Sequence, residues 1–388
     1  MREIVPAAAP DIICFSHLRW NFVFQRPQHL IARCARDRRV YFVEEPMYED
    51  GIVPFLHLES VASVTTAVPR LPEGLGPVEA AAAQRALIDG LIARERVHDF
   101  MLWYYTPMAL AFTGHLRPAA IVYDCMDELS AFKGAPAVLK DFEADLMRRA
   151  SVVFTGGQSL YEAKRHQHAN IHPFPSSVDV AHFAQARQLV NDPPDQTSIA
   201  HPRLGFFGVI DERMDLDLVS GVAASRPEWQ IVIVGPVVKI DAATLPQRPN
   251  LHYLGPKTYD ELPRYVAGWH VALLPFALNE ATRFISPTKT PEYMAAGKPV
   301  VSTSIRDVVR PYGQQGLVRI ADDVPSFVAA CADAMAEDPI ERNRRNDAFL
   351  RQTSWEGTWA RMWRLVDGSL RSSDSDTRQG AAAGRAAM

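Results

Sequence analysis

The chain alternates short apolar runs with longer segments of helical spacing, and this alternation narrows the possible folds more than any other feature. Residues 11–16 (DIICFS) and 229–235 (WQIVIVG) are nearly continuous apolar runs. Such runs are typical of parallel strands that helices cover on both faces. Because parallel strands need long crossover connections, the pattern predicts an α/β protein with doubly wound sheets.

The expected elements form a regular series. In the first half we expect strands at 11–16, 39–44, 61–68, 100–104, 119–123 and 151–155, and helices at 25–36, 77–97 and 136–150. In the second half we expect strands at 203–208, 229–235, 250–255, 270–275 and 300–303, and helices at 216–224, 259–266, 324–335 and 339–352. Strands repeated in this way end at one edge of each sheet, where such folds bind ligands.

A length of 388 residues is too great for one ordinary core and fits two domains. The polar, proline-bearing segment 191–201 has the composition of a linker. We therefore expect a first domain at 1–190 and a second at 202–352. Residues 353–370 carry tryptophans near helical spacing and predict a C-terminal helix, whereas the Ser-, Asp-, Gly- and Ala-rich segment 371–388 predicts a disordered tail.

Composition excludes several classes of function. A net charge of −4 and a pI near 6.3 argue against a dedicated nucleic-acid binder, which would carry a basic surface. The cysteines are too widely spaced for a zinc site or a redox pair, so we expect buried thiols and no bound metal; they are Cys14, Cys34, Cys125 and Cys331. The N-terminus resembles no signal peptide and no apolar stretch reaches about 18 residues, so we expect a cytoplasmic protein.

Residues 283–303 (RFISPTKTPEYMAAGKPVVST) combine a polar loop, a very short helix and a β-branched strand. Pro291 is tolerated only in the first helical turn, so Thr288 or Thr290 is the expected N-cap, and Gly297 ends the helix. Backbone N–H groups at this helix start, beside a lysine, would seat a phosphate. The expected phosphate-binding residues are Ser286, Thr288, Lys289 and Thr290.

Glu292 falls in the first turn of this short helix. A carboxylate pointing at a phosphate would repel it, so we expect Glu292 to accept hydrogen bonds from neutral hydroxyls such as those of a ribose. An incidental glutamate on a capped amphipathic helix is the alternative interpretation.

The run EYMAAGKPVVST, from Glu292 to Thr303, resembles the donor-nucleotide motif of GT-B glycosyltransferases of the family-4 type, or glycosyltransferase group 1. The phrase FSHLRWNFVFQRPQHL at 15–30 resembles the opening of a bacterial polysaccharide-biosynthesis subgroup. The resemblance implies two Rossmann-like domains facing a cleft, with a last helix that crosses back to the first domain. The family usually has a second glutamate where this chain has Phe284, which leaves Glu280 and Asn279 as candidates for the missing sugar contact.

Several residues follow the expected strands of the second domain. Gly208 closes the first strand and is followed by Arg213, an arrangement that could clasp a diphosphate, with a solvated arginine as the alternative. Gly235 closes the next strand. The resemblance implies a basic residue on the leaving phosphate, here Arg213, and places Tyr259 near the nucleobase. We expect these residues to form one nucleotide-sugar site with Lys289 and Glu292.

The loop after the first strand concentrates aromatic rings and cations, which suits a sugar beside an anionic group. It lacks a glycine fingerprint, so a tightly bound dinucleotide cofactor is not expected. From the resemblance we expect this loop to bind the acceptor, and the alternative is that its rings are core residues and its cations are solvated. The expected acceptor-binding residues are His17, Arg19, Trp20, Gln25 and Arg26.

The segment YDCMDE at 123–128 places carboxylates after another buried strand. We favour Asp127 as the functional residue, because Asp124 follows the strand directly and can simply accept hydrogen bonds from turn amides. Helix capping and turn hydrogen bonds are the alternative role for both.

These features predict a glycosyltransferase of the hexosyltransferase class, with Arg213, Lys289 and Asp127 as the catalytic residues. From the resemblance we expect a UDP- or GDP-sugar donor, a glycan or lipid-linked acceptor, retention of anomeric configuration, no metal, and contact with the inner membrane surface as a further option. A nucleotide-sugar epimerase of the same fold and a non-catalytic nucleotide-sugar-binding protein are the alternatives.

Overall fold

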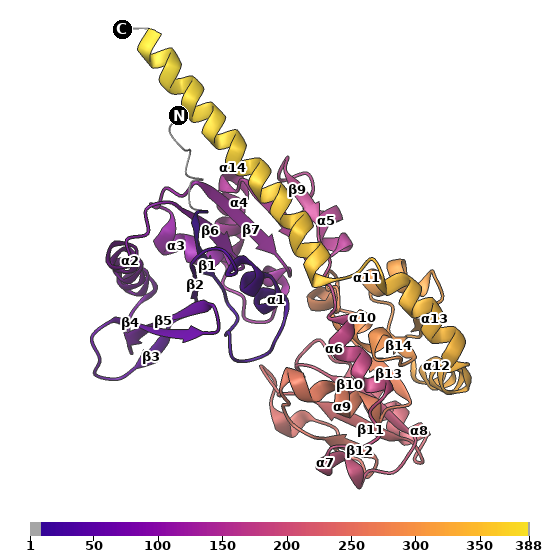
Figure 1. Ribbon diagram of the computed structural model, residues 1–388. Helices are drawn as coiled ribbons and strands as arrows, with labels where there is room; N and C mark the ends of the chain where they lie inside the picture. Colours follow the sequence, from indigo (N-terminus) through magenta and orange to yellow (C-terminus); the bar gives the residue numbers. More distant parts are fainter. Residues whose placement is uncertain (1–8, 387–388) are drawn as a thin grey trace.

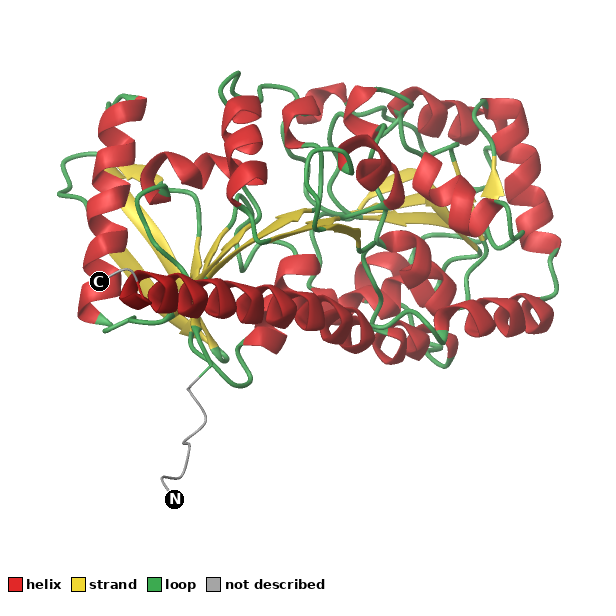
Figure 2. Ribbon diagram, turned by 90° about the horizontal axis from the view of Figure 1, so that it is seen from above, coloured by secondary structure: helices red, strands yellow, loops and turns green. Residues whose placement is uncertain are grey.

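The computed structural model describes residues 9–386 and shows two mainly parallel sheets, each with helices on both faces (Figures 1 and 2). Among these residues the first sheet has nine strands in the order β3-β5-β2-β1-β6-β7-β8-β9, with β4 paired to β5. Its strands are β1 Asp11–Phe15, β2 Val40–Val43, β3 Met47–Glu49, β4 Phe55–Val61, β5 Val64–Pro72, β6 Phe100–Tyr104, β7 Ala120–Cys125, β8 Val152–Thr155 and β9 Ile171–Pro173. Its helices are α1 Arg26–Cys34, α2 Pro77–Arg94, α3 Leu110–Thr113, α4 Leu139–Arg149 and α5 Gln158–Lys164, with short 3₁₀ turns η1 Pro107–Ala109 and η2 Leu129–Ala131.

The second sheet, within the described residues, has six strands in the order β12-β11-β10-β13-β14-β15. They are β10 Arg203–Phe207, β11 Gln230–Val234, β12 Leu251–Tyr253, β13 Val271–Leu274, β14 Val300–Ser302 and β15 Arg319–Ile320. The helices of this half are α6 Val180–Ala184, α7 Pro194–Thr197, α8 Leu216–Ser225, α9 Leu262–Ala267, α10 Lys289–Ala295, α11 Arg306–Val308, α12 Val324–Ala336 and α13 Pro339–Leu350. Short turns are η3 Gln185–Arg187, η4 Ala242–Thr244, η5 Tyr259–Glu261, η6 Glu280–Thr282 and a π-helical turn, η7 Val309–Gly313.

Both sheets have Rossmann-like topology. Counted from its first strand in the chain, the second sheet runs 3-2-1-4-5-6, so the strand order reverses between β10 and β13. In the first sheet the order reverses between β1 and β6. Doubly wound sheets bind ligands in the crevice at this switch point, beyond the carboxyl ends of the strands. In the second sheet, the loops after β10 and β13 are therefore the expected place for a ligand.

The long helix α14 (Trp355–Ala386) crosses back to the first domain, where it lies along the strands and α1 in Figure 1. Its Met362 and Val366 are buried in the same apolar cluster as Ile12 and Val122 of the first sheet. Glu356 forms ion pairs with the α1 end through Arg33 and with the following Arg36. The predicted crossing helix is thus present, because its apolar face completes a core that the first sheet leaves open.

Among the features that differ from the expected elements are an additional edge strand and the length of the last helix. The sheet gains β4, which pairs antiparallel with β5 at the edge of the sheet, where its half-exposed residues give no continuous apolar run. Helix α14 continues to Ala386 and so enters the segment for which we predict disorder. The alanines near the end of that segment favour a helix on local propensity alone.

Within residues 9–386, none of the helices combines the length and the hydrophobicity that crossing a bilayer requires. All the cysteines lie in the described part of the chain, where each is a buried free thiol.

Candidate active site

Gly208, Gly235 and Lys289 follow neighbouring strands of the second sheet and lie close together at the switch point. Gly208 and Gly235 have φ of 139° and 148°, values that favour glycine. A Cβ on Gly235 would lie 1.9 Å from the Gly208 carbonyl oxygen, and a Cβ on Gly208 would lie 2.1 Å from Lys289 Cε. The lysine side chain therefore passes directly over the loop after β10, and its Nζ lies 5.6 Å from the centre of the Phe206 ring.

Arg213 lies on the same loop and is held by Asp211. Its Nε donates to both Asp211 oxygens at 3.0 and 3.1 Å, and its Nη2 donates to Oδ2 at 2.7 Å. Burial opposes the charged form, but the hydrogen bonds and charge of Asp211, together with Asp127, raise the pKa of Arg213. The guanidinium is thus a permanent cation with a fixed orientation.

Asp127 faces this loop from the first domain. Burial raises the pKa of its carboxyl group, while the positive charges of Arg213, Arg26 and Lys289 lower it. Phe132, from the same loop of the first domain, lies 5.4 Å from the Arg213 guanidinium carbon and 5.1 Å from Lys239 Nζ. A carboxylate of one domain and the cations of the other therefore meet in the crevice between the sheets.

The start of α10 matches the expected phosphate seat in its backbone. Thr288 occupies the N-cap position, although its side chain makes no capping hydrogen bond. Within residues 9–386, the backbone N–H groups of Ser286, Thr288 and Lys289 donate to no other group. Gly297, with φ of 74°, ends the helix as predicted. These donors and the Lys289 ammonium group lie at the same helix start.

Buried polar atoms without partners gather around this helix. Among the described residues, Glu292 Oε2, Thr290 Oγ1 and the Tyr259 hydroxyl are buried and make no hydrogen bond. Burial raises the pKa of Glu292 to about 8, against the charge of Lys289, and burial lowers the pKa of Lys289. Native proteins pair nearly all such groups, so these atoms fit a site that a polar ligand completes.

Tyr259 sits in an aromatic cluster between the domains. Its ring stacks on His182 at 4.2 Å between centroids and packs against Phe24 of the first domain at 4.7 Å. His29 lies between Tyr259 and Trp355 of α14. These rings border a cavity of about 410 Å³ lined by Phe24, His29, Arg33, Asp179, His182, Thr258, Tyr259 and Asp260.

The structure separates the predicted acceptor residues. Arg26 is fully buried, with its Nε and Nη2 donating to Asp124 at 2.8 to 3.1 Å and its Nη1 donating to the Phe174 carbonyl oxygen. It has no surface on which an acceptor could bind, because the core holds it as the partner of Asp124. The same pair shows that Asp124 accepts from a guanidinium rather than from turn amides.

The rest of that loop folds against the first domain. Arg19 donates to Glu44, and Trp20 packs edge-on against Phe42 at 4.9 Å. Gln25 occupies the N-cap position of α1. Burial lowers the pKa of His17 to about 4, and the charge of Lys239 in the second domain adds to this effect. Its Nδ1 is buried without a partner, so His17 stays next to the crevice as a neutral imidazole.

Several residues at the crevice gave no signal in the sequence. Asp211 and Glu212 directly precede Arg213 but belong to no recognised motif. Asp307 accepts a hydrogen bond from the Ser159 N–H at 2.9 Å and so joins the two domains. Lys239 has φ of 63°, which is rare for a lysine. For Glu212 and Asp307 only the folded chain shows the role, because their partners Asn279 and Ser159 are far away in sequence.

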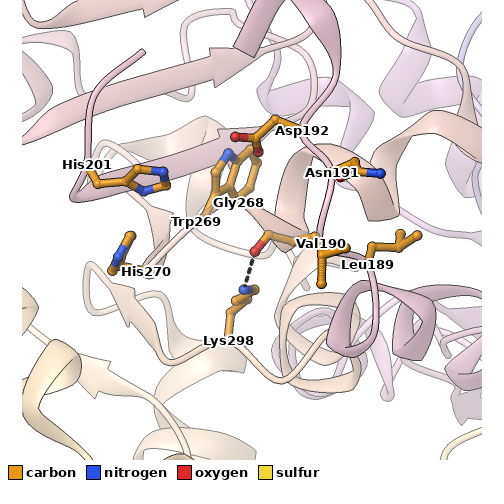
Figure 3. A pocket seen from close by; sticks show the side chains of 10 residues that line it. Leu189, Val190, Asn191, Asp192, His201, Gly268, Trp269, His270 and Lys298 are labelled. Atoms are coloured by element: carbon orange, nitrogen blue, oxygen red, sulfur yellow. Dashed lines mark hydrogen bonds between the residues drawn. The ribbon is translucent and has the colours of Figure 1, made fainter. Parts of the chain in front are cut away.

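A second cavity, of about 370 Å³, lies at the amino ends of the strands of the second sheet, opposite the crevice (Figure 3). His201 and His270 face it, and Lys298 donates to the Ala267 carbonyl oxygen at 2.8 Å. Every polar group that lines it either has a partner or reaches solvent, so it is a weaker candidate than the crevice. No cluster of three or more His, Cys, Asp or Glu side chains that could hold a metal ion is found in residues 9–386.

Two Rossmann-like domains that face a crevice, with a C-terminal helix crossing back to the first, define the GT-B fold of glycosyltransferases. Solved structures agree with this classification. Sucrose-phosphate synthase from Thermosynechococcus elongatus matches with a TM-score of 0.72 at 13% identity, over 94% of this chain and 100% of that chain. HepE of Anabaena, in complex with UDP and glucose, matches with a TM-score of 0.66 at 13% identity, over 93% and 100% of the two chains.

Comparisons of sequence agree with this class. Residues 201–337 match the family described as Glycosyl transferases group 1. TuaH of Bacillus subtilis, named as a teichuronic acid biosynthesis glycosyltransferase, is 25% identical over 271 residues, which are 64% of this chain and 67% of that protein. The predicted resemblance is confirmed: the chain carries a group 1 domain at 201–337, and the protein is a glycosyltransferase.

Proposed function

We propose that this glycosyltransferase moves a sugar from a nucleotide-diphosphate sugar to a glycan or lipid-linked acceptor in cell-surface polysaccharide synthesis. The observation that carries the proposal is the meeting of Lys289, Arg213 and Asp127 at the switch point of the second sheet. A lysine beside an arginine of fixed orientation suits a diphosphate, and the carboxylate across the crevice suits the hydroxyl of an acceptor. The proposed second domain, residues 202–352, binds the donor.

In the proposed reaction an acceptor hydroxyl attacks the anomeric carbon from the face that the diphosphate leaves, so the configuration is retained. The bond between that carbon and the phosphate oxygen breaks, and its electron pair stays on the diphosphate. The hydroxyl proton passes to the departing phosphate oxygen. Lys289 and Arg213 stabilise the negative charge that builds there, which is the part a metal ion plays in other transferases. Asp127 orients the attacking hydroxyl.

The nucleotide contacts follow from the atoms without partners. Glu292 accepts hydrogen bonds from the ribose hydroxyls, Thr290 and the free N–H groups of the α10 start bind the phosphates, and Tyr259 borders the base. The loops at Gly208 and Gly235 allow the diphosphate to approach the backbone. A UDP-sugar is the favoured donor over a GDP-sugar, since an E. coli neighbour with a TM-score of 0.69 is described as bound with UDP-2-fluoro glucose, and HepE with UDP and glucose.

The acceptor binds on the side of the first domain, next to His17 and Gln25. The name of TuaH supports a cell-wall polysaccharide as the acceptor. Two rings of the same loop, Phe22 and Phe24, are 53% and 44% exposed, which supports contact with a lipid-linked acceptor at the inner membrane surface. Arg26 has no part in this site, because it is buried against Asp124.

A transfer assay tests the proposal. The protein is incubated with UDP- and GDP-sugars and a bacterial polysaccharide-precursor extract, with and without EDTA, and nucleotide release and product configuration are measured. We expect acceptor-dependent release of one nucleotide, insensitive to EDTA, with an axial or equatorial linkage that matches the donor. A sugar epimer formed without an acceptor would instead indicate an epimerase. Nucleotide binding without release in any extract would indicate a non-catalytic binding protein.

A further inference from the structure

Glu212 carries a carboxylate whose oxygens are both buried and unpaired. It lies on the loop after β10 between Asp211 and Arg213, and among the described residues neither Oε1 nor Oε2 has a hydrogen-bond partner. A carboxylate removed from solvent without donors is strongly destabilising. In solution, donors from outside the chain must therefore satisfy it.

The neighbouring cation is not that donor. Arg213 directs its Nε and Nη2 to Asp211. The Glu212 carbonyl oxygen accepts from Asn279 Nδ2 at 3.3 Å, which fixes Glu212 beside the loop that leads to Lys289. Its charge acts on Arg213 but makes no ion pair with it. Glu212 thus lies next to Arg213 of the proposed phosphate site.

The other residues that could contact a donor sugar on this side are engaged or turned away. Asn279 accepts from the Thr282 N–H at 3.1 Å as the cap of η6. The Glu280 side chain is 78% exposed and pairs with Arg283. Phe284 packs against an apolar cluster of the first domain. Among the acidic side chains of these two loops that the structure describes, Glu212 is therefore the one with both acceptor oxygens buried and unused, next to Arg213.

We propose that Glu212 accepts hydrogen bonds from hydroxyl groups of the donor sugar and so helps to determine which sugar the enzyme transfers. A sugar offers neutral donors in pairs, which matches two carboxylate oxygens that lack partners. The phosphates stay with Lys289 and Arg213, so the carboxylate and the diphosphate do not compete for one position. This inference rests on the proposed function.

Its test compares nucleotide and nucleotide-sugar binding in one titration series. Dissociation constants are measured by calorimetry for UDP, GDP, UDP-glucose, UDP-galactose and GDP-mannose, and the best-bound pair of sugar and parent nucleotide is used. We expect Glu212→Gln to weaken the nucleotide-sugar about 10-fold or more while the parent nucleotide binds as in the wild type. Glu228→Gln, an exposed glutamate of the same domain, serves as the matched control and leaves both constants unchanged.

Further readouts separate a sugar contact from a structural role. Deoxy-sugar analogues of the donor are titrated, and the penalty of Glu212→Gln should disappear for the analogue that lacks the bound hydroxyl. The melting temperature of the variant should not fall, because the substitution removes a buried unpaired charge. An unchanged ratio of the two constants, or loss of sugar affinity in Glu280→Gln instead, overturns the assignment. Failure of the wild type to bind any of these ligands contradicts the proposed function itself.

Discussion

Lys289 passes over Gly208 so closely that a Cβ on the glycine would lie 2.1 Å from the lysine Cε. The two residues are 81 positions apart, on loops that follow adjacent strands of the second sheet. The position of the proposed phosphate-binding cation is therefore set by a glycine on another loop. This contact explains why a glycine turn and a lysine after a proline-rich loop occur in one site.

Gly208→Ala should displace Lys289, because neither the backbone at φ of 139° nor the contact distance tolerates a methyl group. We expect kcat/KM to fall about 100-fold, in line with a misplaced catalytic group. Steady-state kinetics measures this. Gly74→Ala is the control, since Gly74 also has positive φ but no atom within 4 Å of the added Cβ. Equal losses in both variants would show that backbone strain alone is responsible.

Removing either cation should slow the chemical step. Lys289→Ala and Arg213→Ala are each expected to lower kcat by about 10²–10³, since the charge on the departing diphosphate loses a stabilising partner. Single-turnover measurements with saturating donor separate this effect from weaker binding. Arg344→Ala, whose side chain is 74% exposed, is the control. Near-normal turnover in both site variants is incompatible with the assignment.

Asp124 and Asp127 should have opposite phenotypes. Asp124→Ala leaves the buried Arg26 without its partner, and we expect the free energy of unfolding to fall by about 3–5 kcal/mol. Urea denaturation measures the loss. The double replacement Arg26→Met with Asp124→Leu should recover most of it, because no charge is then left unpaired. A mild effect of Asp124→Ala would mean that Arg26 finds another partner.

Asp127→Asn should retain stability and lose activity. Its carboxyl group lies in the crevice with Arg213 and Lys289. We expect turnover to fall about 100-fold, because the amide replaces the carboxylate that accepts a hydrogen bond from the attacking hydroxyl. Kinetics and a melting curve on the same preparation measure both properties. Full activity with reduced stability would reassign Asp127 to a structural role.

His29 should make stability depend on pH. Burial against Trp355 and Tyr259 lowers the pKa of its imidazole to about 3, from an ordinary value of 6.5. Below pH 6.5 the unfolded chain therefore binds a proton at His29 that the folded protein does not bind. The contribution of His29 to the free energy of unfolding is fully present above pH 6.5, and the free energy should fall by about 2 kcal/mol by pH 5.

Urea titrations of the wild type and His29→Phe at pH 7.5 and 5 measure this term as the difference between the two proteins. The phenylalanine keeps a ring in the stack but cannot be protonated. His57→Phe on the exposed strand β4 should behave like the wild type. An identical pH dependence in the His29 variant and the wild type would show that another group is responsible.

The positions of the strands could be predicted from the sequence because each buried strand is a continuous apolar run. Residues at strand ends, such as Gly208 and Gly235, could therefore be placed at the correct edge of the sheet. β4 could not be found in this way, because an edge strand that is half exposed has no such run. Pro291 and Gly297 also allowed the start and end of α10 to be predicted correctly.

Side-chain partners were less accessible to sequence reasoning. Arg26 lies in a loop with the composition of a binding site, yet it is buried in an ion pair with Asp124, which is 98 positions away. Glu212 lies beside a predicted residue but stood out only through the burial of its oxygens. Pairing and burial are set by tertiary contacts, which no local pattern in the chain records.

The central claim is that Lys289 and Arg213 hold the diphosphate of the donor, and nucleotide binding tests it most directly. Melting temperatures are measured with UDP, GDP and ADP for the wild type, Lys289→Ala and Arg213→Ala. One nucleotide at about 100 times its Kd should stabilise the wild type by about 2.7 kcal/mol, and both variants should lose most of that shift. No shift with any nucleotide, or an equal shift in all three proteins, would contradict the account.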